Sequence, residues 1–290
     1  MPDTGFSGAR VVVTGALGRL GRRITVALRR AGFDVIGLDR TVSAEGDVPV
    51  ITGSILDADA LAQAFAGADT VVHAAALLSA HGTQAEIFDV NTRGTWTVFD
   101  TAARCGVRRV VSFSSECAIG QCFQRIARPP RFLPIDEEHP LEPQDAYSLS
   151  KQIGEAIAAS FVRSTGRSAV ILRPTWVMFP ITPEDLAAHR GLMHGDMWCW
   201  VAPDDVADAT VAAATLDTEL ETFFLGAPNT LCTQPTLELL AARFGTPPEL
   251  RRPEFYAVDP TASLFDCRRA AARLGFRPTR DWAALMKATP

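Results

Sequence analysis

Lysine and tyrosine are scarce in this 290-residue chain, which has only Lys151, Lys287, Tyr147 and Tyr256. One of the two lysines nevertheless follows one of the two tyrosines by four residues, in the stretch YSLSK. Residue frequencies alone would produce such a pair in roughly one or two chains in a hundred. Residues four apart share one face of a helix, so Tyr147 and Lys151 are candidates for two groups that act together.

Other absences exclude whole classes of protein. The net charge is −5 without a strongly basic stretch, which disfavours nucleic-acid binding. No apolar run approaches the ~20 residues of a membrane span, and residues 1–10 lack the pattern of a signal peptide. The six cysteines form no CxxC pair and the histidines no HExxH motif, so we expect no metal and reduced thiols. The sequence favours a cytoplasmic protein that binds a small molecule and neither nucleic acid nor membrane.

The first half of the chain alternates short apolar runs with segments of helical spacing. Apolar strands that alternate with helices indicate a parallel sheet covered on both faces, the doubly wound α/β (Rossmann) class. Gly32 is expected to end the first helix and Asp57 to begin the second. The expected strands are 9–15, 33–39, 48–54, 68–76, 107–115 and 167–174, and the expected helices are 19–32, 57–67, 84–105 and 146–164.

A glycine-rich turn, TGALGRLG, joins the first strand to the first helix and places Gly15, Gly18 and Gly21 three residues apart. The first glycine permits a tight turn, the second admits a pyrophosphate, and the third lets the helix pack closely. The helix N-terminus adds free N–H groups and partial positive charge. Asp39 ends the second strand, where a carboxylate binds ribose hydroxyls and repels a 2′-phosphate. The pattern favours NAD, with NADP as the alternative because the adjacent Arg40 can accept that phosphate.

Two serines, Ser114 and Ser115, end the fifth expected strand and therefore lie on the same sheet edge as the glycine turn. If the helix from 146 packs beside that strand, Ser115, Tyr147 and Lys151 converge near a nicotinamide. Free tyrosine has a pKa near ~10, but a lysine ammonium and an oxidised nicotinamide both favour the phenolate. The serine hydroxyl would orient the substrate oxygen. These residue types suit the oxidation of an alcohol.

These motifs carry a family resemblance. TGALGRLG, VVHAAA, NTRGT, SFSSECAIG, YSLSK and ILRP follow in an order that resembles the extended short-chain dehydrogenase/reductases of the NAD-dependent epimerase/dehydratase family. The resemblance implies NAD as cofactor, catalysis by Ser115, Tyr147 and Lys151, an Asn91 that supports the active-site helix, and a homodimer of paired long helices. The expected cofactor contacts are Gly15, Leu17, Gly18, Gly21, Asp39, Arg40, Ser54, Ile55, Ala74, Ala75, Asn91, Lys151 and Pro174.

The later segments bear on domains. Residues 119–146, rich in proline and charge, are expected to form a long loop that is functional or mobile. We expect residues 1–174 to form the NAD-binding domain, joined again by 201–226. Residues 175–200 and 227–290 would form a small substrate-binding region, with helices near 235–244, 266–274 and 281–288. Six residues are expected either to line the substrate pocket or to form this region's core: Trp176, Met178, Met193, Met197, Trp198 and Trp200.

The substrate is the least determined feature. SSECAIG resembles the SSNHTIG-like stretch of the uronate dehydrogenases, compact members that oxidise a free sugar acid. Glu116 replaces an amide there and Cys117 a histidine, so the carboxylate either repels a uronate or binds hydroxyl or amino groups. The sequence favours an NAD-dependent dehydrogenase of a small sugar-like substrate. The alternatives are a sugar-nucleotide epimerase or dehydratase, a dinucleotide-sensing protein, or an NADPH-dependent reductase. Substrate contacts are expected at Ser79, Glu116, Cys117, Thr175 and Arg190.

Overall fold

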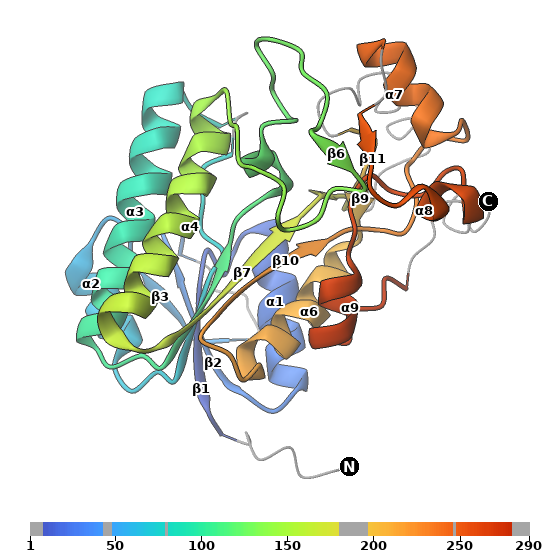
Figure 1. Cartoon of the computed structure of the whole chain (residues 1–290). Coiled ribbons are helices and arrows are strands. Elements are labelled where there is room, and N and C mark those ends of the chain that lie inside the picture. Colours follow the sequence, from blue (N-terminus) through green and yellow to red (C-terminus); the bar gives the residue numbers. More distant parts are fainter. Residues whose placement is uncertain (1–7, 43–47, 79–80, 180–196, 246–247, 280–290) are drawn as a thin grey trace. The chain divides into compact units, whose positions relative to one another are not determined.

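The computed structural model describes residues 8–42, 48–78, 81–179, 197–245 and 248–279 (Figure 1). The predicted helix at 281–288 lies outside these residues. The chain forms two compact units that each contain several separate segments. Unit 1 comprises Met1–Ser114, Ile153–Leu172 and Ala207–Thr222, and unit 2 comprises Ser115–Gln152, Arg173–Val206 and Phe223–Pro290. None of the described helices combines the length and the apolar character that a membrane span requires.

A seven-stranded sheet forms the centre of unit 1, in the order β10-β7-β5-β4-β1-β2-β3. Its pairs β1·β2, β1·β4, β2·β3, β4·β5 and β5·β7 are parallel. In register, Val12 lies between Ile36 and Val71. The prediction of a doubly wound α/β fold is therefore confirmed. The strands are β1 Arg10–Thr14, β2 Asp34–Asp39, β3 Val50–Thr52, β4 Thr70–His73, β5 Arg109–Phe113, β7 Ser168–Pro174 and β10 Leu220–Leu225.

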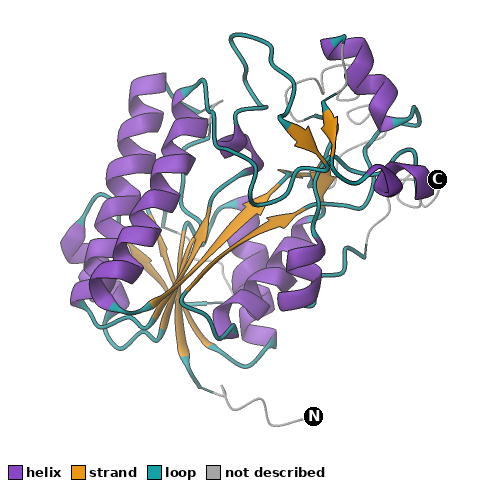
Figure 2. Ribbon diagram, viewed as in Figure 1, coloured by secondary structure: helices purple, strands orange, loops and turns teal. Residues whose placement is uncertain are grey.

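Helices cover both faces of this sheet, as Figures 1 and 2 show. On one side lie α2 (Ala58–Phe65), α3 (Gln84–Arg104) and α4 (Ala146–Thr165), and on the other lie α1 (Arg19–Arg30) and α6 (Pro203–Thr215). Short-range signals set the helix ends. The Asp57 carboxylate accepts the Asp59 and Ala60 N–H groups and so begins α2, as predicted. Gly32, in the left-handed region at φ +95°, follows the end of α1.

The core of unit 1 lies between the sheet and α2, α3 and α4. Val12, Val71 and Val110 of three adjacent strands are fully buried there. Phe99 of α3 and Phe161 of α4 meet edge to face, with ring centroids 5.3 Å apart. A buried aliphatic or aromatic side chain contributes roughly 1.5–3 kcal/mol, so these residues hold α3 and α4 on the sheet that carries the glycine turn.

A second core lies in unit 2 and contains residues whose role the sequence left open. Met178, Met197, Trp198 and Trp200 are buried in this cluster and Trp176 packs against it, so all five belong to a core. Met193 lies outside the described residues. The core also contains Phe224 and Phe265, whose ring centroids are 4.9 Å apart.

Unit 2 contains short elements that the sequence did not predict. Glu116–Ile119 forms a 3-10 helix that leads into the predicted loop of residues 119–146. Within this loop, Phe132–Leu133 forms β6, which pairs with β11. The predicted helices near 235–244 and 266–274 are α7 and α9. Elsewhere in the described part of this unit lie β8 Trp176–Val177, β9 Trp200–Val201, α7 Thr236–Phe244, β11 Glu249–Leu250, α8 Pro253–Val258 and α9 Arg268–Arg273.

Candidate active site

A cavity of about 310 Å³ lies in unit 1, where β1, β2, β3 and β4 end. Nine of the predicted cofactor residues line it: Gly15, Leu17, Gly18, Asp39, Arg40, Ser54, Ile55, Ala74 and Ala75. Seven further lining residues, most of them apolar, were not predicted: Leu38, Thr41, Gly53, Leu56, Ala76, Leu77 and Val90. Ligands of doubly wound sheets bind at this edge.

The glycine turn is packed so closely that a side chain at any of its three glycines would meet backbone atoms. Gly15 has φ +71°, and a Cβ there would lie 2.8 Å from the Ala75 Cα. A Cβ on Gly18 would lie 3.2 Å from the Gly15 carbonyl oxygen. Gly21 does not line the cavity, but its Cβ would lie only 2.0 Å from that same oxygen. The first turn of α1 can therefore pack against the loop only with glycine at this position, and the backbone stays accessible to a pyrophosphate.

Asp39 connects the end of β2 to the glycine turn. One carboxylate oxygen accepts the Leu17 N–H at 2.9 Å, and the other accepts the Thr41 N–H and hydroxyl at 3.2 and 2.8 Å. The carboxylate thus lies at the cavity wall, and hydrogen bonds from the backbone of Leu17 and Thr41 fix its position. An oxygen pair held in this way fits the two hydroxyls of a ribose. Arg40 beside it is exposed.

Asn91 does not line the cavity but supports its wall through Leu77. Its side-chain amide accepts the Leu77 N–H at 2.7 Å and donates to the Leu77 carbonyl at 2.9 Å. These two bonds fix the segment after β4, which lines the cavity. The buried His73 ring supports the same region, since its nitrogens lie 2.9 Å from the Thr14 hydroxyl and 3.0 Å from the Thr95 hydroxyl. These two contacts of His73 were not predicted from the sequence.

The three predicted catalytic side chains come together within unit 2. Ser115 caps the 3-10 helix and accepts the Cys117 N–H at 3.1 Å. Tyr147 is the second residue of α4 and lies close to Ser115, whose hydroxyl lowers the pKa of the phenol. Lys151 follows one turn later, with its Nζ 5.6 Å from the centre of the Tyr147 ring. The neighbouring Ser114 is turned to another partner, because its hydroxyl donates to Glu155 at 2.6 Å.

The surroundings of Tyr147 determine its acidity. Burial raises the pKa of the phenol well above its usual value, and negative charge on Cys117, Cys122 or Glu116 would raise it further. The hydrogen bond from Ser115 lowers the pKa. The Tyr147 side chain is only half-buried by exposed area, but the dense packing around its ring makes burial the dominant effect. In the cofactor-free chain this phenol is therefore protonated at neutral pH.

The predicted substrate contacts and Pro174 either do not line the cavity of unit 1 or lie outside the described residues. Glu116 and Cys117 are buried beside the Ser115 cap. The Thr175 N–H donates to the Leu225 carbonyl at 2.9 Å, a strand-like contact in unit 2. Pro174 ends β7 and belongs to unit 2, so it does not line the cavity of unit 1. Ser79 and Arg190 lie outside the described residues.

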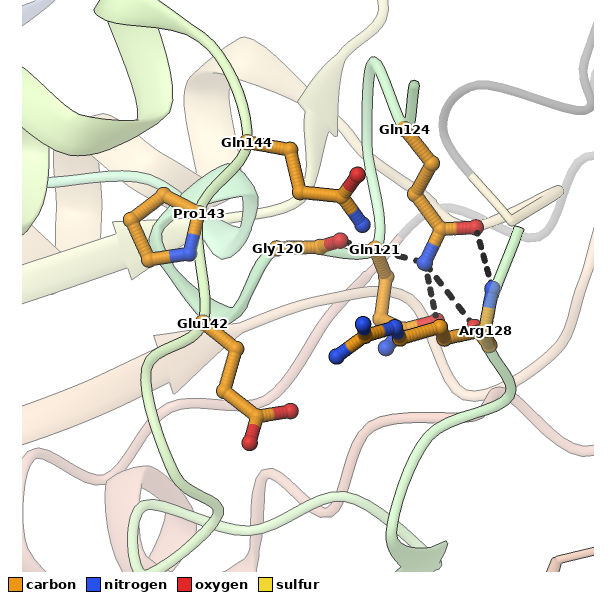
Figure 3. A pocket seen from close by; sticks show the side chains of 7 residues that line it. All are labelled: Gly120, Gln121, Gln124, Arg128, Glu142, Pro143 and Gln144. Atoms are coloured by element: carbon orange, nitrogen blue, oxygen red, sulfur yellow. Dashed lines mark hydrogen bonds between the residues drawn. The ribbon is translucent and has the colours of Figure 1, made fainter. Parts of the chain in front are cut away.

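A second, partly open cavity, also of about 310 Å³, is lined by residues of the long loop of unit 2 (Figure 3). The Gln124 amide donates to the carbonyls of Gly120 and Arg128, at 3.1 and 2.8 Å, and so closes the loop around the cavity. Sequence reasoning did not find this cavity. Its lining residues are Gly120, Gln121, Gln124, Arg128, Glu142, Pro143 and Gln144.

The model of the NAD dependent epimerase/dehydratase family matches residues 11–190, more than half of the chain. The chain belongs to this family. It is an NAD-dependent enzyme of the type that includes dehydrogenases, epimerases and dehydratases, as the motifs predicted. The cavity fits this cofactor, because its glycine turn leaves room for a pyrophosphate and the Asp39 carboxylate is placed for a ribose.

Individual relatives resemble somewhat more than half of the chain. A Stigmatella aurantiaca 4-hydroxy-2-methyl-3-oxo-4-farnesyl-3,4-dihydroquinoline-1-oxide ketoreductase is 34% identical over 58% of this chain and 50% of its own. An L-arabinose 1-dehydrogenase (NAD(P)(+)) of Haloferax volcanii is 33% identical over 59% and 68%. A uronate dehydrogenase of Pseudomonas syringae pv. tomato is 29% identical over 57% and 58%. The chain thus matches about half to two thirds of the length of these relatives.

A solved structure resembles nearly the whole chain. A short-chain dehydrogenase/reductase superfamily protein from Agrobacterium tumefaciens, solved with bound NAD, has a TM-score of 0.73 at 24% identity. The match covers 96% of this chain and 95% of that one. At this identity the likeness establishes the fold.

Proposed function

We propose that this enzyme oxidises a secondary alcohol or hemiacetal of a small sugar-like substrate with NAD, and that Tyr147 is the catalytic base. The observation that carries the proposal is the convergence of Ser115, Tyr147 and Lys151 within one unit. The substrate class is supported by the arabinose and uronate dehydrogenases among the relatives.

The cofactor would be held by the cavity of unit 1. Backbone N–H groups of the glycine turn and the N-terminus of α1 would bind the pyrophosphate, while Asp39 would bind the adenosine ribose. Bound NAD supplies the hydride acceptor. The Asn91 bonds to Leu77 would keep the wall of this cavity fixed during turnover.

Three side chains of unit 2 would orient the substrate hydroxyl and accept its proton. The Ser115 hydroxyl would donate to the substrate oxygen and fix its position. Tyr147 would then remove the hydroxyl proton as the carbon–hydrogen bond breaks. Because burial raises its pKa, the phenol needs nearby positive charge to act as a base. The Lys151 ammonium provides one such charge.

A second function rests on the same residues. An epimerase or dehydratase would oxidise a sugar nucleotide in the same way but return the hydride and keep its NAD. The family itself favours this candidate, because its model is described by epimerases and dehydratases. A small substrate is favoured by the short stretch between the end of β7 at Pro174 and the start of α6 at Pro203.

Net NADH formation distinguishes the two functions. The purified chain is mixed with excess NAD and free aldoses, uronic acids, polyols or sugar nucleotides, while absorbance of NADH is followed and products are analysed. The proposal expects stoichiometric NADH with a free sugar or sugar acid. An isomerised or dehydrated sugar nucleotide without NADH would establish the second function instead.

The chain offers a matched control for the base. Tyr147→Phe removes the proton acceptor, so we expect kcat to fall by roughly 10²- to 10⁴-fold with an unchanged Kd for NAD. Tyr256→Phe removes the chain's other tyrosine hydroxyl, which lies in the core of unit 2 and contacts the Ser263 carbonyl at 3.4 Å. This variant should keep its kcat. Full activity of Tyr147→Phe would refute the role of the phenol.

A further inference from the structure

Three potential metal ligands gather in unit 2 beside Tyr147. The Glu116 carboxylate and the Cys117 and Cys122 sulfurs offer ligand atoms that all lie within 4.8 Å of one another. All three residues are buried, with 2%, 6% and 1% of their surface exposed. Nearby charge on each of them affects the Tyr147 phenol, which places the cluster next to the proposed base.

Local backbone geometry holds this cluster together. The Ser115 side chain accepts the Cys117 N–H and starts the 3-10 helix that carries Glu116 and Cys117. Gly120, at φ +82°, then reverses the chain, and its N–H donates to the Cys117 carbonyl at 2.9 Å. A Cβ at Gly120 would lie 2.0 Å from the Glu142 carbonyl oxygen. The reversal returns Cys122 to Cys117 over four intervening residues, in a turn that only glycine permits.

We propose that Glu116, Cys117 and Cys122 form a binding site for a soft divalent metal ion, Zn²⁺ or Cd²⁺, in which Cys122 and Cys117 supply thiolates and Glu116 an oxygen. Metal–sulfur and metal–oxygen bonds of ~2.3 and ~2.0 Å in tetrahedral geometry separate the ligand atoms by roughly 3.3–3.8 Å. Since no separation here exceeds 4.8 Å, small side-chain rotations would bring the set to bonding distance. Paired thiolates select zinc-like ions over Mg²⁺ or Ca²⁺.

The charges of the site balance when the ion is bound. Each thiol loses its proton to the buffer as its sulfur forms a bond to the metal, and no electron is transferred. Two thiolates and a carboxylate supply three negative charges. The ion supplies two positive charges, and the nearby guanidinium of Arg243 supplies the third. Burial lowers the pKa of Arg243, while the charge of Cys122 raises it, so the guanidinium is close enough to Cys122 for an electrostatic interaction.

Occupation of this site would affect the proposed reaction. Three protein ligands leave one position of a tetrahedral ion open, and the cluster lies close to Tyr147. An ion bound there would compete with the substrate oxygen for the phenol and for Ser115. We expect Zn²⁺ to inhibit turnover, a consequence that rests on the proposed function, whereas metal binding itself does not.

Cadmium titration tests the site directly. CdCl₂ is added to the full-length chain without cofactor, kept reduced with a phosphine, and ultraviolet thiolate-to-cadmium absorption is recorded together with calorimetric stoichiometry. We expect one ion per chain with two thiolate ligands. Cys117→Ser and Cys122→Ser should each remove most of the absorption and weaken binding at least tenfold. The matched control Cys105→Ser, in a cysteine of unit 1, should leave both unchanged.

Several results would overturn the proposal. Absence of thiolate absorption, or absorption that persists in both site variants, would show that the cluster binds no metal. If a site variant does not fold by circular dichroism, cadmium-113 NMR of the wild-type chain decides, since two sulfur ligands shift the resonance far from that of oxygen-only sites. A resonance typical of oxygen ligands alone would also refute it. These measurements are independent of turnover, so a wrong proposed function would not alter them.

Discussion

Substitution of Gly21 by alanine tests whether the glycine turn holds NAD. The added Cβ would lie 2.0 Å from the Gly15 carbonyl oxygen, whereas real Cβ contacts are essentially never shorter than 3.0 Å. The oxygen must therefore retreat by about 1.0 Å, the difference of these two distances. The Gly15 carbonyl accepts the Gly18 N–H at 3.1 Å, so the whole turn moves with it.

The expected loss follows from the hydrogen bonds that the turn offers to phosphate. Hydrogen bonds to a charged group contribute about 1.5–3 kcal/mol each, and a displacement of about 1 Å misaligns at least one of them. Because 1.4 kcal/mol corresponds to tenfold in affinity, the Kd of Gly21→Ala for NAD should rise roughly 10- to 100-fold. The fold should persist, since overpacking costs about 1–3 kcal/mol.

Gly154→Ala is the matched control. Gly154 lies within α4, and its Cβ would meet only the Thr95 methyl at an ordinary 3.7 Å. Alanine favours a helix over glycine by about 1 kcal/mol, so this variant should melt slightly higher and bind NAD as the wild type does. Calorimetry gives both Kd values. A folded Gly21→Ala protein with wild-type affinity for NAD would refute the account of the turn.

Three further predictions concern NAD specificity, the cavity wall and pH. Asp39→Ala should weaken NAD binding about tenfold and narrow the preference over NADP, measured as the ratio of the two Kd values, because the repulsion of a 2′-phosphate is lost. Asn91→Ala frees the Leu77 backbone and should raise the Kd for NAD several-fold without changing the melting temperature by more than a few degrees; unchanged affinity would argue against its positioning role. His139 is buried, accepts the Arg131 N–H, and has a pKa lowered mainly by burial. Since the fold favours its neutral form, its contribution to stability is complete above about pH 6.5 and is lost as pH falls through the lowered pKa. Melting temperatures are measured between pH 5 and 8, roughly the window in which histidine titrates. The melting temperature should fall more steeply with decreasing pH for the wild type than for His139→Gln, and equal slopes of melting temperature against pH would contradict this assignment.

Local chemistry explains why the sequence predicted the first half of the fold so well. The Asp57 cap, the Gly32 stop and the apolar strands each depend on neighbours within a few residues. The glycine turn is equally local, because Gly21 must avoid the carbonyl of Gly15 only six residues earlier. Such constraints are written in consecutive residues and can be recognised without the fold.

Unit 2 was harder to predict because its structure depends on distant pairs. The strand β6 has two residues, Phe132 and Leu133, and exists only because it pairs with Glu249 and Leu250. No period can be recognised in two residues. The same holds for the cavity of unit 2, whose glutamines bind loop carbonyls and carry no motif. The proximity of Cys122 to Cys117 likewise depends on a reversal at Gly120 that the sequence alone does not specify.

The position of Lys151 beside Tyr147 explains why a chain with few lysines has one here. The Lys151 Nζ lies 5.6 Å from the centre of the ring, where an effective dielectric constant of ~20 gives an attraction to the phenolate on the order of 3 kcal/mol. Burial opposes ionisation of the same phenol, so lysine alone leaves it protonated. A second positive charge is needed, and oxidised NAD carries one. The base would therefore become active only when the oxidised cofactor is bound, which makes proton removal conditional on the presence of a hydride acceptor. An arginine at 151 would keep the charge, but its broad planar head could not occupy the nearly closed position of a compact ammonium.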